Sequence, residues 1–434
     1  MNLGIPLHEA RRRVEAHLHA CPVVHEPPER CDGLYTAEPV YAPTNLPHDT
    51  IARRDGYAVR SADIAVATRD NPVHLPIGAT VTAGSAGSTP PPELVRGQAV
   101  GVMTGALIPG GADTVLGAEE VERSADGNTL VIFEPAPAGR RIAQPGDEIA
   151  AGECVVAARR PVGPETLALM TALGLTGLPV HRRPKVAVLP IGDELVSPGT
   201  ALESGQRYPD GAILLAAAMR GLKLETYLLS PAPDDLETLR QRLRGAVDDG
   251  ADLLITTGGT GGGSKDLVRE LLARPEAEVV FSGVAVRPGG STAFGFCGPV
   301  PWFALPGTPA AAVTAFDLLV RPAARALLGA GDTRNPEATV TLLNPEQEPS
   351  PGRLQRLRVE VRAGRLYARR VRYRNIYREL AESNALWVPG AAGKTGGPDS
   401  LSGTGGPGGA DSPGEPAQRI RAELIDAPEI NAES

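Results

Sequence analysis

The pattern of apolar and polar positions predicts a change of architecture along this 434-residue chain. Between residues 185 and 330, short apolar runs alternate with amphipathic stretches, which predicts strands that alternate with helices. This alternation is typical of a parallel sheet with helices on both faces. The expected strands span residues 185–191, 225–229 and 253–255, and the expected helices span residues 210–220, 234–247, 267–272 and 309–328.

Shorter extended runs, broken by glycine and proline, predict two small β domains on either side of this region. The first has runs at residues 75–81, 99–103, 114–121 and 129–133, and the second has runs at residues 339–343, 357–361 and 366–371. Two further helices are expected, one at residues 6–20 and one at residues 164–173. The chain is therefore expected to contain several domains, in keeping with its length.

A low-complexity stretch follows the second β domain. Residues 389–416 are rich in glycine, serine and proline and contain no aromatic residue. Such a composition cannot bury enough surface to order itself. We therefore expect a disordered tail over residues 390–434, with a weak helix at residues 417–425.

A glycine-rich loop is the most informative stretch of the chain. Five glycines lie among residues 258–263, between an apolar run and an amphipathic one, which predicts a buried strand, a tight loop and a helix. Glycine lets a backbone approach a ligand closely, and amides at a helix start favour an anion. The loop matches neither standard phosphate-binding fingerprint, because Ser264 replaces the last glycine of one and Lys265 follows serine in the other. A tight turn without a ligand remains the alternative.

Two other loops are expected to lie beside this one. Residues 192–195 follow the first predicted strand, and residues 305–309 follow a later apolar run. Ligands of open parallel sheets bind outside the carboxyl ends of the strands. We therefore expect all three loops to line a single crevice.

Composition narrows the choice of ligand. The net charge of −8 makes an extended nucleic-acid surface improbable, although a local basic pocket for a phosphorylated small molecule is compatible with it. No apolar run reaches the roughly eighteen residues that span a bilayer, and no C-x-x-C pair suggests a zinc ribbon or disulfide framework. We expect a cytoplasmic protein with reduced thiols and neither a nucleic-acid nor a membrane partner.

Histidine is confined to the first half of the chain. All seven histidines lie at or before His181, so none is available within the predicted parallel-sheet domain. Chemistry confined to the glycine-rich loop must therefore use carboxylates, amides, hydroxyls or cations. This excludes a Ser-His-Asp triad or a histidine-rich zinc site within that domain.

Seven short motifs recur in an order that resembles one known family. They are Asp55-Gly56-Tyr57-Ala58, Met103-Thr104-Gly105, Pro145-Gly146-Asp147-Glu148-Ile149, Gly192-Asp193-Glu194-Leu195, Thr257-Gly258-Gly259, Arg287-Pro288-Gly289 and Leu305-Pro306-Gly307. On composition alone, the first two are better explained as hairpin turns, with Asp and Gly chosen for their turn conformations. In this order over residues 5–389, the motifs resemble the bacterial MoeA family of molybdopterin molybdenumtransferases and the E-domain of gephyrin.

The resemblance implies an α/β multidomain fold with a parallel-sheet, molybdopterin-binding domain, a β-rich inserted domain and a small C-terminal β domain. The implied segments are a discontinuous N-terminal linker domain (1–46 and 139–182), the β-rich domain (47–138), the parallel-sheet domain (183–330), the C-terminal domain (334–389) and the tail (390–434). The subunit is expected to form a homodimer whose site combines the parallel-sheet domain of one subunit with the β-rich domain of the other.

The activity implied by the resemblance is molybdenum insertion. Such an enzyme takes adenylylated molybdopterin, releases AMP with the help of Mg²⁺, and transfers molybdate to the dithiolene sulfurs. A molybdopterin adenylyltransferase is a further expected partner. Family positions correspond here to three catalytic residues, Asp55, Glu194 and Asp266, with Mg²⁺ at Glu194 and Asp266. The corresponding substrate-binding residues are Thr104, Asp234, Gly258, Gly259, Lys265, Arg287 and Arg358.

These residue types suit the implied chemistry. Carboxylates accept hydrogen bonds from the N–H groups of a pterin, and Mg²⁺ prefers carboxylate and phosphate oxygens. Cleavage of a phosphoanhydride needs charge stabilisation more than a protein nucleophile. Helix capping or pairing with a helix dipole is the local alternative for Glu194 and Asp234.

Several family positions are nevertheless replaced. The departures are Ala143 for an arginine, Ser264 for an acidic residue, Gly290 for the second lysine of a K-P-G-K motif, Thr308 for an asparagine, and Arg374 for a serine. Loss of a lysine from an anion site removes on the order of 1 to 3 kcal/mol of charge-assisted binding. A working insertase and a catalytically impaired paralogue that still binds molybdopterin therefore both fit the sequence. A pure scaffold is the weaker third alternative.

Overall fold

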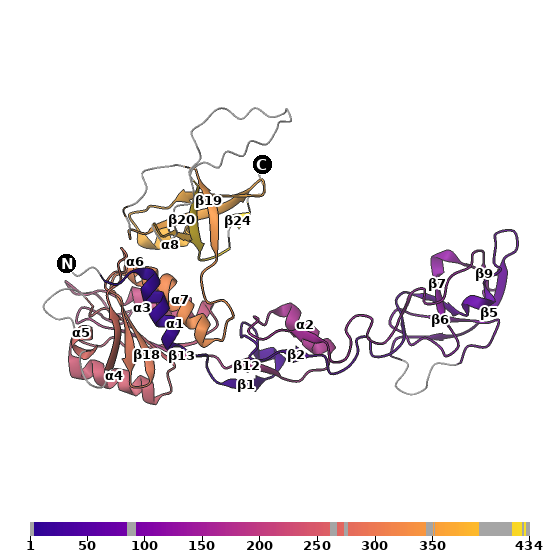
Figure 1. Cartoon of the computed structure of the whole chain (residues 1–434), viewed down its shortest axis with the longest axis horizontal. Helices are drawn as coiled ribbons and strands as arrows, with labels where there is room; N and C mark the ends of the chain where they lie inside the picture. The colour runs from indigo at the N-terminus through magenta and orange to yellow at the C-terminus, as the bar shows by residue number, and fades with distance from the viewer. Residues whose placement is uncertain are drawn as a thin grey trace, which may run out of the picture.

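The computed structural model describes residues 4–84, 93–260, 267–272, 277–343, 350, 352–389, 419–427 and 429–430. Within these residues the molecule is elongated, with the domain around β13 and β18 at one end and the β-rich domain around β5 and β6 at the other (Figure 1). A slender linker region joins them. The C-terminal β domain packs against the domain around β13 and β18, beside α6 and α7.

A six-stranded sheet forms the centre of the parallel-sheet domain. Its strands, in spatial order, are β14 (Glu225–Leu228), β13 (Lys185–Pro190), β15 (Leu253–Thr257), β18 (Val300–Leu305), β17 (Ala293–Cys297) and β16 (Ala277–Ser282). The first four are parallel, as the sequence predicts. The last two, which the sequence analysis missed, are antiparallel and continue the sheet on the β18 side.

Helices cover both faces of this sheet, as expected from the alternating pattern. One face packs α3 (Asp210–Gly221), α6 (Pro309–Ala315) and α7 (Arg321–Leu327) around Phe294 and Phe303, whose ring centroids are 4.6 Å apart. The other face packs α4 (Leu236–Asp248) and α5 (Leu267–Leu272) around the buried Trp302. The single helix expected at residues 309–328 is interrupted by a π-helix, Phe316–Val320, between α6 and α7.

The linker region is built from short strand pairs and two helical elements. β1 (Val23–Glu26) pairs with β12 (Leu178–His181), β2 (Val40–Tyr41) with β11 (Cys154–Val156), and β3 (Ile51–Ala52) with β10 (Ile142–Ala143), beside α2 (Pro164–Ala172) and the 3-10 turn Pro28–Arg30. The N-terminal helix α1 (Leu7–His17) packs instead against the π-helix and α7. It therefore contacts the parallel-sheet domain, although its residues were grouped with the linker.

The β-rich domain is a second six-stranded sheet with its own core. Its spatial order is β7 (Thr114–Gly117), β4 (Gly56–Val59), β6 (Ala99–Val102), β5 (Val73–Val81), β9 (Thr129–Ile132) and β8 (Glu122–Arg123), with 3-10 turns at Ser61–Asp63 and Ala118–Glu120. Separate apolar clusters lie on its two sides. The sheet thus holds the Asp55 and Thr104 motifs on a rigid frame.

The C-terminal domain closes on itself because β21 pairs with both β19 and β20. Its elements are β19 (Glu337–Leu342), β20 (Gln355–Arg362), β21 (Arg365–Arg370), α8 (Ile376–Ala381), β22 (Ala385–Trp387), β23 (Arg419–Leu424) and β24 (Glu429–Ile430). The prediction of a disordered tail over residues 390–434 is wrong for β23 and β24, which are strands of this domain. The weak helix expected at residues 417–425 is wrong, since β23 pairs with β19 and β22.

The physical reason for this error is visible in β23 itself. Ile420 and Ala422 are buried in the core while Arg419 and Arg421 are exposed, which is the period-two alternation of a strand. The low-complexity residues that precede this segment concealed the pattern. Residues 390–418 lie outside the described part of the chain. None of the described helices is long and apolar enough to cross a membrane.

Candidate functional site

The three predicted loops line one crevice at the carboxyl ends of β13, β15 and β18. The cavity has a volume of about 680 Å³. Its lining includes Gly192, Glu194 and Leu195 from the first loop, Gly258, Gly259 and Thr260 from the second, and Pro306, Gly307 and Thr308 from the third. The position agrees with the rule for ligand sites in open parallel sheets.

Close backbone contacts explain why glycine is required in this crevice. Gly258 has a φ of +95°, and a Cβ atom there would lie 2.2 Å from the carbonyl oxygen of Ile191. The Gly258 amide donates a hydrogen bond to the carbonyl oxygen of Leu305 at 3.1 Å. A Cβ at Gly307 would lie 3.3 Å from the Cα of Gly258. The floor of the crevice is therefore polypeptide backbone, which leaves the space above it for a ligand.

Carboxylates line one part of the cavity. Glu194 and Asp234, two of the predicted site residues, both belong to its lining, together with Asp210 at the start of α3. The Asp234 amide donates to Asp193 Oδ1 at 2.9 Å. The local alternative for Asp234 was helix capping, but α4 is capped by Asp235, which accepts the Thr238 amide at 2.7 Å. Hydrogen bonds from Thr238, first from its side chain and then from its amide, lower the pKa of Asp235. Asp234 is thus not the capping residue.

Part of the predicted site falls outside the described residues. Asp266 and Lys265 both lie within residues 261–266, of which nothing can be said. Glu194 is therefore the one member of the predicted magnesium pair that the structure describes. In the described part of the chain, no group of three or more His, Cys, Asp or Glu side chains gathers as a metal cluster would.

Asp55 and Thr104 contact each other in the β-rich domain. Asp55 Oδ1 accepts hydrogen bonds from the backbone amide and the hydroxyl of Thr104, both at 2.7 Å. These hydrogen bonds lower the pKa of Asp55, because they favour its ionised form. Within one chain this pair lies at the opposite end of the molecule from the crevice, so the structure does not bring it to Glu194 (Figure 1).

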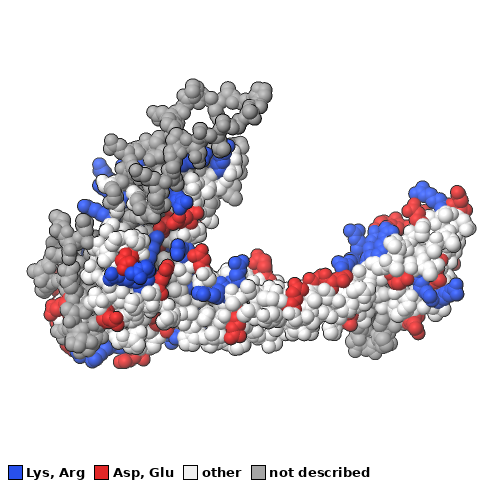
Figure 2. Space-filling view, in the orientation of Figure 1, with Lys and Arg blue, Asp and Glu red and all other residues white. Residues whose placement is uncertain are grey.

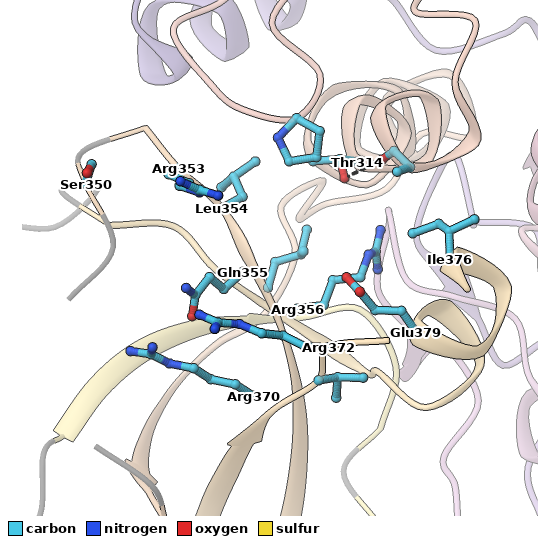
Figure 3. Close-up of a pocket in the computed structure, with 14 residues that line it drawn as sticks. Thr314, Ser350, Arg353, Leu354, Gln355, Arg356, Arg370, Arg372, Ile376 and Glu379 are labelled. Carbon is cyan, nitrogen blue, oxygen red and sulfur yellow. Dashed lines mark hydrogen bonds between the residues drawn. The ribbon is translucent and has the colours of Figure 1, made fainter. Parts of the chain in front are cut away.

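A second cavity lies where the C-terminal domain meets α6. It has a volume of about 600 Å³ and is lined by Thr314 and by four arginines, Arg353, Arg356, Arg370 and Arg372 (Figure 3). Glu379 is the acidic residue among the described lining. Arg370 also lies over the Trp387 ring, 5.1 Å from its centroid. We call this cavity the arginine pocket. Figure 2 shows Lys and Arg side chains, interspersed with Asp and Glu, around this junction of domains.

Sequence reasoning missed these four arginines and chose two others. Arg287 is exposed, and its side chain lines neither cavity. Its backbone forms hydrogen bonds with Gly352 and Leu354. Arg358 lies opposite Arg369 in the β20–β21 pair and is also outside both linings. A usable signal was present, since ten arginines lie between residues 353 and 378.

The two cavities are neighbours. Pro288 lines the arginine pocket while Gly289 lines the crevice, and Ala310 and Ala311 are divided in the same way. A hydrogen bond from Tyr377 of α8 to Asp210 of α3 also joins the two domains. Burial, followed by this hydrogen bond, raises the pKa of Tyr377 to about 12. The crevice and the arginine pocket thus form adjacent parts of one polar region.

Comparison with known proteins gives matches over most of the chain. Residues 5–174 match the MoeA N-terminal region (domain I and II), and residues 187–326 match a probable molybdopterin binding domain. Molybdopterin molybdenumtransferase 2 of Mycobacterium tuberculosis is 35% identical over 340 residues, which cover 77% of this chain and 82% of the relative. Molybdopterin molybdenumtransferase of Staphylococcus aureus is 31% identical over 327 residues, which cover 75% of this chain and 76% of the relative.

Solved structures show the same architecture. The molybdopterin biosynthesis MoeA protein of Pyrococcus horikoshii has been solved twice, and both structures align with a TM-score of 0.73. The first is 26% identical and the alignment covers 98% of this chain and 99% of that one. The second is 24% identical, with 97% and 99% covered. The alignments therefore extend over nearly the whole chain.

Proposed function

Because the chain belongs to the MoeA family of molybdopterin molybdenumtransferases, we propose that it transfers molybdate to adenylylated molybdopterin with release of AMP. Its role as a transferase in molybdenum cofactor biosynthesis follows from its named relatives. The alternative of an impaired paralogue is not favoured by these relatives. What we add to this role is the adenylylated form of the substrate, the release of AMP and the residues that carry out the reaction.

The observation that supports this reaction most strongly is the adjacency of two cavities of different chemistry. The crevice offers backbone groups and the carboxylates Glu194, Asp210 and Asp234, with Arg207 as a cation paired to Asp210, whereas the arginine pocket offers four arginines beside Glu379. A pterin is rich in N–H donors and suits the first, while molybdate is an oxyanion and suits the second. Consecutive residues of one turn, Pro288 and Gly289, and of α6, Ala310 and Ala311, line the two cavities, so an oxyanion bound in one lies beside a pterin bound in the other.

Magnesium fits the crevice through its carboxylates. Glu194 and Asp234 belong to one lining, and Mg²⁺ is commonly held by one or two carboxylates together with substrate phosphates and water. We propose that these two residues hold Mg²⁺ with Asp266. When bound, the ion would neutralise charge on the phosphate as AMP leaves. Gly258 and Gly259 bring backbone close to the substrate, and Glu194 and Asp234 orient it.

A second subunit is needed to complete the site. Asp55 and Thr104 lie at the far end of the chain from the crevice, too distant to act there in the same subunit (Figure 1). In a twofold-symmetric dimer, each β-rich domain can approach the crevice of the partner. We propose such a homodimer, in which the ionised Asp55 faces the substrate. We also propose a cytoplasmic location, in keeping with four free cysteines, and substrate delivery by the adenylyltransferase.

Subunit mixing tests the shared site. Asp55→Asn and Asp234→Asn should each lower the rate of AMP release and molybdoenzyme reconstitution by at least about tenfold. When the two variants are unfolded and refolded together, activity should recover to about one quarter of the wild-type value, because half of randomly assorted dimers are mixed and each mixed dimer has one intact site of two. Activity that stays at the level of the single variants after mixing would contradict a site that is shared between two subunits.

A direct assay tests the reaction itself. Purified protein is incubated with adenylylated molybdopterin, molybdate and Mg²⁺, and AMP release and reconstitution of a cofactor-free molybdoenzyme are measured. Both are expected. Tight pterin binding with neither product would favour the impaired paralogue.

A further inference from the structure

A buried carboxylate lies directly behind the arginine pocket. Asp317 belongs to the π-helix between α6 and α7, and only 2% of its side chain is exposed. Its two oxygens bind different arginines: Oδ1 accepts from Arg321 at 3.0 Å, and Oδ2 accepts from Arg356 at 3.2 Å. Arg321 is its neighbour one turn along the helix. Arg356 comes from β20 of the C-terminal domain and lines the pocket.

This ion pair is part of a larger polar contact between the domains. The backbone carbonyl of Asp317 accepts a hydrogen bond from Asn335 at 2.8 Å, and Asn335 also donates to Glu423 of β23 at 3.3 Å. Arg11 of α1 binds the two oxygens of Glu423 at 2.9 and 2.8 Å. These charged contacts, together with the hydrogen bond from Tyr377 to Asp210, join the C-terminal domain to the parallel-sheet domain, and Asp317 is the carboxylate whose partner, Arg356, lines the pocket.

The location of the π-helix matters for this contact. A π-helical turn displaces side chains relative to an α-helix, and such turns are frequent at functional sites. Here the turn lies immediately after α6, whose residues Ala310 and Thr314 line the arginine pocket. Thr314 lines the pocket and Asp317 binds Arg356 of β20, so both side chains face the C-terminal domain. The helix therefore supplies both a pocket wall and the carboxylate behind it.

We propose that Asp317 is a positioning residue for oxyanion binding, because it fixes the orientation of Arg356 in the wall of the arginine pocket. This inference rests on the proposed binding of molybdate there. An arginine fork holds an oxyanion best when its plane is set in advance, since less side-chain freedom is then lost on binding. Arg356 is only 8% exposed, and its bond to Asp317 sets that plane.

The proposal predicts an effect opposite in sign to simple electrostatics. Asp317 is an anion near a site for an anion, so its charge alone weakens oxyanion binding. If charge were its main effect, Asp317→Asn would bind molybdate more tightly. If positioning is its main effect, the same variant binds molybdate more weakly, because Arg356 loses its fixed orientation.

Titration calorimetry with sodium molybdate separates these outcomes. For Asp317→Asn we expect the Kd for molybdate to rise by about tenfold, as for the loss of one charge-assisted hydrogen bond. Arg321→Met is the matched control, since it removes the other partner of Asp317 without touching the pocket lining. We expect its Kd to stay within about twofold of wild type. Unchanged or tighter binding by Asp317→Asn, or equal losses in both variants, would overturn the proposal.

A second variant covers the case in which Asp317→Asn does not fold. Arg356→Lys keeps the positive charge but replaces the planar fork by a point charge. The molybdate concentration for half-maximal turnover should rise by about tenfold, while turnover at saturating molybdate stays within about twofold. An unchanged half-maximal concentration would contradict a role for the orientation of Arg356. If replacing Arg353 and Arg372 also leaves molybdate binding unchanged, the binding site itself is assigned wrongly, and the proposed function loses its oxyanion pocket.

Discussion

The crevice and the arginine pocket are neighbours, but they are built in different ways. The crevice uses loops that follow three neighbouring strands of one sheet, and its floor is backbone held close by glycine. The arginine pocket forms where β20 and β21 of the C-terminal domain, a separate part of the sequence, meet α6. The first is a property of one fold, whereas the second exists only while two domains are docked. With the proposed assignment of ligands, pterin binding depends on a single domain and oxyanion binding depends on how two domains are placed.

The largest expected effect is a loss of molybdate affinity when arginines of the arginine pocket are replaced, with little change in pterin affinity. Arg353→Met combined with Arg372→Met removes two lining cations, each worth about 1.5 to 3 kcal/mol in charge-assisted bonding, so the Kd for molybdate should rise by about 100-fold or more. Affinity for the pterin nucleotide should remain within about threefold. Calorimetry with each ligand alone measures both values.

The matched control for this experiment lies on the same hairpin. Arg362 and Arg365 face each other at the end of β20 and β21 and are outside the pocket lining. Replacing both by methionine removes the same net charge. If that control weakens molybdate binding as much as the pocket variant does, affinity reflects overall charge and the comparison between the cavities fails.

A smaller effect is expected in the crevice, on turnover rather than on oxyanion binding. Asp234→Asn should lower the Mg²⁺-dependent rate of AMP release by about ten- to 100-fold, because a carboxylate that accepts metal or pterin N–H groups is lost. Molybdate binding should be unchanged. Rates measured over a range of Mg²⁺ concentrations check the first expectation, and calorimetry checks the second.

The adjacent residue provides the control for Asp234. Asp235→Asn keeps the cap of α4, since asparagine is an equally good N-cap residue, and it removes the same charge one position away. Its activity should stay close to wild type. A comparable fall in both variants would mean that the charge near the start of α4, rather than Asp234 itself, supports turnover.

The same contrast explains what could be predicted from the sequence. The parallel strands and the shared crevice follow from apolar runs and glycine turns that are local in the chain, so loops after β13, β15 and β18 could be grouped by the rule for such sheets. The capping role of Asp235 rather than Asp234 depends on backbone geometry at the start of α4, which residue type alone does not settle. Local patterns thus predicted the position of the crevice. They did not predict which of the two neighbouring carboxylates caps α4.

The arginine pocket could not be found in that way, because its walls are far apart in sequence. Thr314 and Arg372 meet only when the C-terminal domain docks on α6. The same reason hid β23, which follows a long low-complexity stretch and is stabilised by pairing with β19 and β22. Antiparallel β16 and β17 were missed since glycine and proline break the pattern around them. Tertiary pairing, rather than local propensity, determines each of these elements.

The smallest expected effect concerns the link between the two cavities. The pKa of Tyr377 is raised to about 12, first by burial and then by its hydrogen bond to Asp210. A raised pKa means that the neutral phenol is favoured in the folded protein, so the contact is fully present below the ordinary tyrosine pKa of about 10 and is lost as the pH rises through about 12. Burial also raises the pKa of Tyr227, so ultraviolet titration of tyrosinate should show late-titrating tyrosines, one of which disappears in Tyr377→Phe. At neutral pH this variant should bind both ligands within about twofold of wild type, because each cavity keeps its own lining. A clear loss of molybdate affinity in Tyr377→Phe at neutral pH would instead show that this single contact holds the C-terminal domain in place, and that the arginine pocket depends on it.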